Sequence, residues 1–159
     1  MPRRGPPATS KLRVGKQPPR YRFFLNPYTD ARFTSCPQCG NKTRARKLPL
    51  VIHVDQGATI TLNKTCKFCP ACDLLIAHQD EIEGLLAAYF GQNKPEVLGN
   101  DYLVLGTEDR AAWRRGMHSP ISPQELLEHL HDFRDYVTFK AAPRWEWVPP
   151  PSPLHKPKE

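Results

Sequence analysis

The segments Cys36-Pro37-Gln38-Cys39 and Cys69-Pro70-Ala71-Cys72 decide how this chain is interpreted. A Cys-x-x-Cys turn places two thiolates on one edge of a tetrahedron, and two such turns supply four sulfur ligands for one ion. A tetrahedral set of thiolates favours Zn²⁺ and leaves no position for water or substrate. The pattern therefore predicts one structural Zn²⁺ per chain, with Cys36, Cys39, Cys69 and Cys72 as its ligands.

A fifth cysteine, Cys66, lies three residues before Cys69 and offers a second way to build the second turn. A hairpin that turns between Gln56 and Gly57 places Cys69 closer than Cys66 to the level of Cys39. The Cys69/Cys72 turn also repeats the Cys-Pro-x-Cys form of the first turn. Both observations favour Cys72 as the fourth ligand, while the pair Cys66/Cys69 remains open.

Hydrophobic patterns around the turns predict the secondary structure. Alternation and apolar runs predict strands at residues 42–46, 50–54, 59–65, 73–77 and 102–106. A helix is predicted after residue 78 from the helical spacing of Ile82, Leu85, Leu86 and Tyr89. A short helix is expected from Thr107 as N-cap to Gly116. A last helix should begin at the capping box Ser122-Pro123-Gln124-Glu125 and bury Leu126, Leu127, Leu130 and Phe133.

Over about residues 33–78 the chain resembles a zinc ribbon, the β-hairpin metal module of many transcription, translation and nucleic-acid-processing proteins. The two Cys-Pro-x-Cys turns and Gly40 carry the resemblance; Asp73, where the second turn often has Gly, and the extra Cys66 depart from it. The expected fold class is α+β, with a zinc-ribbon antiparallel hairpin followed by two to three helices and one further strand. A rubredoxin-like iron site is the competing interpretation. Residues 40–68 hold one aromatic, Phe68, which argues against the aromatic core expected of a rubredoxin.

Proline and tryptophan positions suggest where the domain ends. Five of the 18 prolines lie before residue 21 and six after residue 142. Such segments contain too few apolar residues to offset the entropy lost on ordering. We expect disordered Pro-rich tails at 1–20 and 143–159 around a single domain, 21–142, with the zinc ribbon at about 33–78 and a helical part at about 79–142. Within the second tail, Trp145-Glu146-Trp147 is expected to pack back on the domain, because exposed indoles are costly; the alternative is a short linear motif for a partner.

The charge is uneven along the chain. Residues 1–67 hold 14 basic and 2 acidic side chains, a net charge of +12, whereas residues 68–159 hold 9 and 14, a net charge of −5. Lys42, Arg44 and Arg46 are expected to project from one side of a strand and to contact phosphates. We therefore expect a nucleic-acid or ribonucleoprotein accessory module. The alternative is a protein-docking module that uses the acidic helical half.

Two function classes receive no support from the sequence. It contains no Gly-rich phosphate loop, nucleophile elbow or His-Glu-x-x-His motif, and we do not expect an enzyme. No apolar run approaches the ~20 residues that span a bilayer, and the N-terminus lacks the apolar stretch of a secretory signal. Clustered cysteines fit metal binding in a reducing compartment. These features predict a cytoplasmic protein with no membrane partner.

Overall fold

The computed structural model describes residues 14–55, 58–93, 95–118, 122–140 and 146–148. Seven strands form one sheet in the order β6-β5-β2-β3-β4-β1-β7. In chain order they are β1 (Arg22–Asn26), β2 (Arg44–Val54), β3 (Ala58–Cys69), β4 (Leu74–His78), β5 (Tyr102–Glu108), β6 (Leu130–Asp132) and β7 (Asp135–Tyr136). A separate two-stranded sheet pairs β8 (Thr138–Lys140) with β9 (Glu146–Val148).

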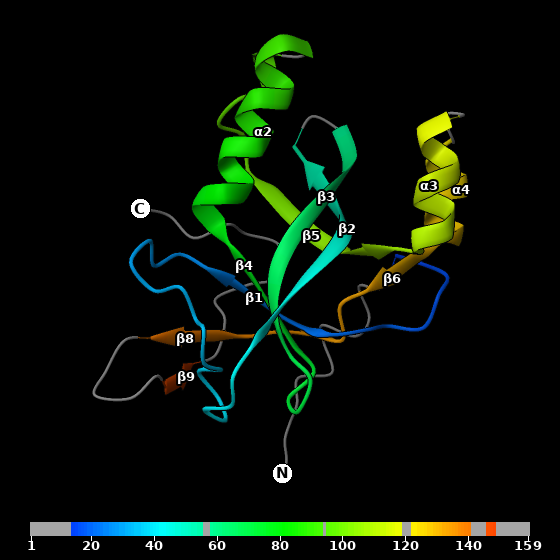
Figure 1. The fold of residues 1–159 in the computed structure, drawn as a ribbon. Coiled ribbons are helices and arrows are strands. Elements are labelled where there is room, and N and C mark those ends of the chain that lie inside the picture. Colours follow the sequence, from blue (N-terminus) through cyan, green and yellow to red (C-terminus); the bar gives the residue numbers. More distant parts are fainter. Residues whose placement is uncertain (1–13, 56–57, 94, 119–121, 141–145, 149–159) are drawn as a thin grey trace.

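The helices that the structure describes lie at the two sides of the sheet (Figure 1). They are α2 (Gln79–Asn93), the 3₁₀ helix η1 (Pro95–Val97), α3 (Arg110–His118) and α4 (Pro123–Glu128). In the part of the chain that the structure describes, every helix is too short or too polar to cross a lipid bilayer.

The predicted fold class is wrong, because the protein is mainly β structure. The expected zinc ribbon followed by helices is replaced by a curved seven-stranded sheet in which the β2–β3 hairpin is central (Figure 1). One cause is β1, for which no strand was predicted. Phe23 and Phe24 in β1 are buried, and β1 pairs in parallel with both β4 and β7. A long-range pairing of this kind leaves no local signature between the paired segments.

The second cause is the region after α4, where a continuing helix was predicted. The capping box does start α4, and Ser122 Oγ accepts from Glu125 N. The helix ends at Glu128, however, and Leu130 lies in β6, fully buried and opposite Glu108 of β5. Gly106 permits this close pairing, since a Cβ there would lie 2.0 Å from His131 O. Strand pairing and burial thus outweigh the local helical pattern through Leu130 and Phe133.

The predicted hairpin is present and longer than expected. β2 and β3 pair without interruption from Arg44 opposite Phe68 to Val54 opposite Ala58. Because side chains alternate along each strand, this pairing gives the sheet two distinct faces. On the first, which we call the α2 face, buried side chains such as Leu50 and Ile52 form one core with Ile82, Leu86 and Phe90 of α2. On the opposite α3 face, Val51, His53, Leu103 and Leu105 lie beneath α3 and α4.

The predicted helices differ from the structure in detail. In α2, Ile82 and Leu86 are buried as expected, but Leu85 and Tyr89 are 39% and 45% exposed. The next helix begins two residues later than predicted, because Thr107 belongs to β5. Asp109 caps α3 instead, with its Oδ2 accepting from Ala112 N over 3.1 Å.

The two predicted tails fall largely outside the described residues. Residues 1–13 and 149–159 lie there, as does Trp145 of the Trp-Glu-Trp segment. Residues 14–20 run beside β6, where Gly15 N donates to Asp132 Oδ1 over 2.6 Å. Trp147 lies in β9 opposite Phe139 and is 53% exposed. The described part of the chain therefore extends beyond residues 21–142 at both ends.

Candidate metal centre

The four predicted ligands meet at the end of the β2–β3 hairpin opposite its turn. The Sγ atoms of Cys36, Cys39, Cys69 and Cys72 all lie within 4.8 Å of one another. Cys36 Sγ lies 3.9 Å from Cys72 Sγ, and Cys39 Sγ lies 3.6 Å from Cys69 Sγ. A tetrahedral ion with metal–sulfur bonds of about 2.3 Å requires S···S distances of about 3.8 Å. The four thiols are therefore close enough together to bind one metal ion.

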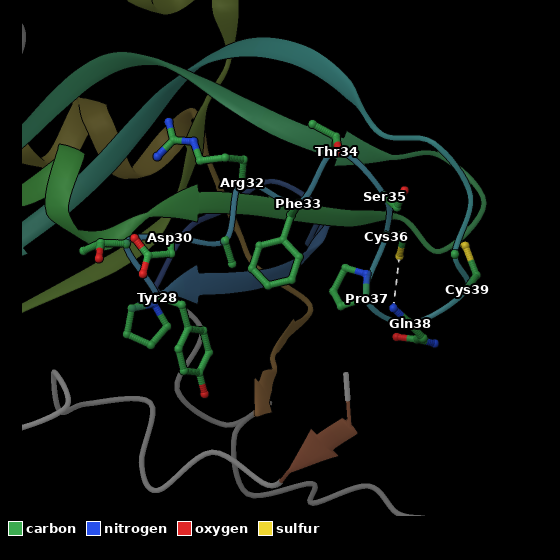
Figure 2. A pocket seen from close by; sticks show the side chains of 14 residues that line it. Tyr28, Asp30, Arg32, Phe33, Thr34, Ser35, Cys36, Pro37, Gln38 and Cys39 are labelled. Carbon is green, nitrogen blue, oxygen red and sulfur yellow. Dashed lines mark hydrogen bonds between the residues drawn. The ribbon is translucent and has the colours of Figure 1, made fainter. Parts of the chain in front are cut away.

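The first turn is held by backbone hydrogen bonds directed at its sulfurs. Gln38 N donates to Cys36 Sγ over 3.3 Å (dashed in Figure 2), and Asn41 N donates to Cys39 Sγ over 3.4 Å. Gly40 N donates to Cys36 O, and Gly40 has a φ of +81°, which glycine adopts without a steric cost. These contacts orient both sulfurs and explain the glycine that follows Cys39.

The second turn contains an aspartate at the position where zinc ribbons often have glycine. Asp73 has a φ of +54°, in the left-handed region that aspartate and asparagine tolerate better than most residues. Its carbonyl oxygen accepts from Arg22 N over 2.8 Å, and its Oδ2 lies 2.8 Å from Arg134 Nη2. Asp73 therefore keeps the turn conformation of a glycine and also attaches the turn to β1.

Cys66 lies on the other face of the sheet from Cys69. Side chains alternate along β3, and these two cysteines are three residues apart. Cys66 is 3% exposed within the core of the α2 face, with its Sγ 3.6 Å from Lys64 O. Burial raises the pKa of the Cys66 thiol to about 12. Cys66 is thus a buried, neutral thiol outside the four-sulfur group, and the alternative pair Cys66/Cys69 does not match the structure.

A second, smaller core supports the thiols from one side. It contains Cys36 and Cys69 and the buried side chains Phe24, Phe33, Leu74, Ile76, Val137 and Phe139. Cys69 is fully buried, whereas Cys39 is exposed. The four-sulfur group therefore has one side against the core and one side toward solvent. The aromatic positions of this core, Phe33 and Phe139 in particular, were not predicted, because they lie in segments without a regular hydrophobic period.

The loop of residues 27–40, between β1 and β2, borders an open hollow of about 1080 Å³ (Figure 2). Cys36 and Cys39 line it, together with Tyr28, Phe33 and Pro37. Tyr28 anchors the loop, since its hydroxyl donates to Phe139 O over 2.8 Å. Cys69 and Cys72 are not among the described lining residues, and the hollow therefore lies beside the four-sulfur group and not around it.

The thiols of the group differ in acidity. Burial raises the pKa of Cys36 and of Cys72. The backbone hydrogen bond from Asn41 lowers the pKa of Cys39. Metal binding requires thiolates, and a bound cation removes the protons of thiols that would otherwise stay neutral. Three or four uncompensated thiolates at this spacing would repel one another, which makes the group a poor arrangement without a cation.

The three predicted phosphate-binding side chains lie next to this group but differ from one another. Lys42 and Arg44 are exposed. Arg46 is half-buried, with its guanidinium 5.1 Å from the ring centre of Phe68 and 5.9 Å from that of Tyr21. The interpretation of Arg46 as a solvent-facing cation is therefore corrected, because this side chain also covers two aromatic rings.

Two further cations, Lys47 and Lys67, lie at the same end of the hairpin, on the face of the sheet opposite to Arg44 and Arg46. Together with Lys42, Arg44 and Arg46 they form what we call the basic end. Among the residues that the structure describes, none of the five forms an ion pair with an acid. Lys64 is different, since it is buried and its Nζ lies 2.6 Å from Glu81 Oε1.

Comparison of the chain with protein-family models, with curated proteins and with solved structures found no match.

Proposed function

We propose that the four thiols bind one structural Zn²⁺, and that the protein is a non-catalytic module that binds nucleic acid through the basic end. The metal part of the proposal rests on S···S distances of 3.6 and 3.9 Å, close to the separation of about 3.8 Å that a tetrahedral zinc–thiolate site requires. Four sulfur ligands complete the coordination of Zn²⁺. The ion would then stabilise the two turns and take no part in a reaction.

One observation carries the nucleic-acid part: five cations gather at the thiol end of the hairpin without an acidic partner among the described residues. Unpaired cations on a rigid strand pair are suited to a phosphate backbone, since they need not be released from internal ion pairs. The basic segment of residues 1–20 carries a further six cations and no acid. Contacts of this kind fix no base sequence, and we propose binding with little sequence preference.

The test is a titration of the zinc-loaded protein with single-stranded and duplex oligonucleotides of DNA and RNA at several salt concentrations. For duplex DNA the slope of log K against log salt should be about −0.9 per neutralised phosphate. The double variant Lys42→Ala/Arg44→Ala should reduce that slope by about two such units, and both side chains are exposed enough to be removed without unfolding. Arg114→Ala is the matched control, because Arg114 is an exposed cation on α3.

Two results would contradict the proposal separately. An absence of binding at low salt would refute the nucleic-acid part and favour the alternative of a protein-docking module, for which α2 exposes Leu85 and Tyr89. Metal analysis that finds iron in a coloured protein would refute the zinc part and favour electron transfer by a rubredoxin-like site, since four thiolates can bind either metal.

A further inference from the structure

The α3 face of the sheet contains a cavity of about 820 Å³ at the end of the hairpin away from the thiols. Strands β2, β3 and β5 form its floor, and α3 and α4 form its wall. This volume falls in the range of about 300–1,000 Å³ that is typical of small-molecule sites. The cavity is separate from the basic end and from the four-sulfur group, and the proposed function makes no use of it.

The apolar side chains around the cavity are only half-covered by the protein. Leu103 and Leu105 of β5, Trp113 of α3, and Leu126 and Leu127 of α4 all line it and are all of intermediate burial. Helix α4 has no buried residue, although its two leucines point at the sheet side of the molecule. Full burial of a leucine contributes about 1.5–3 kcal/mol. Because these five large apolar side chains are only half-covered, the core of the protein does not fill the space between them. An apolar molecule can complete this packing.

The cavity also has a polar group at one place in its lining. Glu108 is 5% exposed and carries the only carboxyl group among the described lining residues. Thr61, which also lines the cavity, hydrogen-bonds to that carboxyl, and burial raises the pKa of Glu108. Arg115 and His129 act on Glu108 electrostatically from outside the lining. The other polar side chains in the described lining are hydroxyls and the His53 imidazole, whose Nδ1 lies 2.9 Å from Thr59 Oγ1, and no lysine or arginine lines the cavity.

We infer that this cavity binds a small molecule with an apolar body and a protonated amine, in which the amine donates to the Glu108 carboxylate. The apolar walls provide affinity for the body, and the buried carboxylate selects the head group by charge. A carboxylate ligand would place two like charges in one apolar space, and an alcohol would offer a neutral hydrogen bond. Charge-assisted hydrogen bonds are roughly twice as strong as neutral ones. The order of affinity is therefore amine, then alcohol, then carboxylate.

Three matched probes test the inference, 4-phenylbutylamine, 4-phenylbutanol and 4-phenylbutyrate, which share one body and differ in the head group. Isothermal titration of the full chain should show the amine binding about tenfold more tightly than the alcohol, with no binding of the carboxylate. One more methylene in the amine should tighten binding about fourfold. Backbone amide shifts should locate the probe at Thr61 and Leu105.

Variants separate the head group from the body. Glu108→Gln should weaken the amine about tenfold and leave the alcohol within about twofold. Glu125→Gln is the matched control, because Glu125 is an exposed acid on α4 and does not line the cavity. Leu126→Trp, on the half-exposed side of α4, should fill the space and abolish binding of all three probes. It keeps the inference testable if Glu108→Gln does not fold.

Three outcomes would overturn the inference. Equal affinities for the three probes would indicate unselective partition onto apolar surface. No binding of the amine to the full chain would exclude the site as proposed. Binding that begins only after deletion of residues 2–12 would indicate that this segment of the chain, which leads to Val14 at the cavity, is the occupant.

Discussion

Removal of the metal from the zinc-loaded protein should unfold only the thiol end of the sheet. Without the ion, the largest apolar support of the first turn is Phe33, whose side chain is 6% exposed in the smaller core, and the buried Cys36 and a few hydrogen bonds add to it. Burial of one phenylalanine contributes about 1.5–3 kcal/mol, which corresponds to an opening constant of about 10⁻¹ to 10⁻². Structural zinc contributes about 10 kcal/mol or more in zinc-finger peptides. The turn should therefore open readily once the ion is gone.

The remainder of the sheet has its own support. Leu50, Ile52 and Val54 pack against α2 in the larger core, and β2 pairs on both sides, with β3 and β5. These strands do not depend on the thiols, and their amides should stay protected. We therefore expect a sharp boundary along β2 between the thiol end, which unfolds, and the opposite end, which stays folded.

Amide hydrogen exchange with and without a chelator measures this boundary. The amides of Cys36, Gly40 and Thr43, each hydrogen-bonded within the first turn or at its base, should exchange at least about 100-fold faster after metal removal. The amides of residues 50–54 and 102–105 should change by less than about threefold. Uniform acceleration across the sheet would show that the metal supports the whole fold, and unchanged exchange at Cys36 would show that no metal stabilises the turn.

Three further predictions concern single side chains. Cys66→Ala should keep one metal per chain in metal analysis and cost about 1–2 kcal/mol in urea unfolding, because it shortens a buried side chain outside the thiol group; loss of the metal would contradict this. Arg46→Ala should lower the unfolding free energy by about 1 kcal/mol through loss of its ring contacts, while the exposed Arg44→Ala should leave it within about 0.5 kcal/mol. Equal effects would argue against those contacts. The hydrogen bond from Lys64 lowers the pKa of Glu81, and the stability from this pair should be present above about pH 4.3 and be lost as pH falls through the lowered pKa. Unfolding from pH 2 to 7 should show this step, and Glu81→Gln should remove it.

Much of the candidate site was predictable from the sequence, because its determinants are local. A Cys-x-x-Cys turn sets the spacing of its two thiolates within four residues. The hairpin that connects the two turns was also predicted, but Val54 pairs with Ala58, one residue away from the register of a reversal between Gln56 and Gly57. The unequal division of charge between residues 1–67 and 68–159 is likewise a property of composition.

The sheet itself depended on pairings between distant segments. Nothing in residues 22–26 indicates that they lie beside residues 74–78, and nothing in the helical pattern after Ser122 indicates that Leu130 will leave the helix to pair with β5. These outcomes follow from burial and backbone hydrogen bonding in the assembled sheet, which outweigh local propensity when the two disagree.

The same distinction separates side chains that looked alike in sequence. Arg44 and Arg46 lie on the same face of β2, yet among the described contacts only Arg46 covers aromatic rings, because Tyr21 is brought beside it from another segment. Lys64 and Lys67 lie three residues apart on β3 and so on opposite faces of the sheet, and Lys64 is buried against Glu81 because α2 covers its face. Sequence spacing thus determined which residues can share a turn or a strand face. The tertiary structure decided which of them meet water, an aromatic ring or an opposite charge, because those neighbours come from elements far apart in the chain.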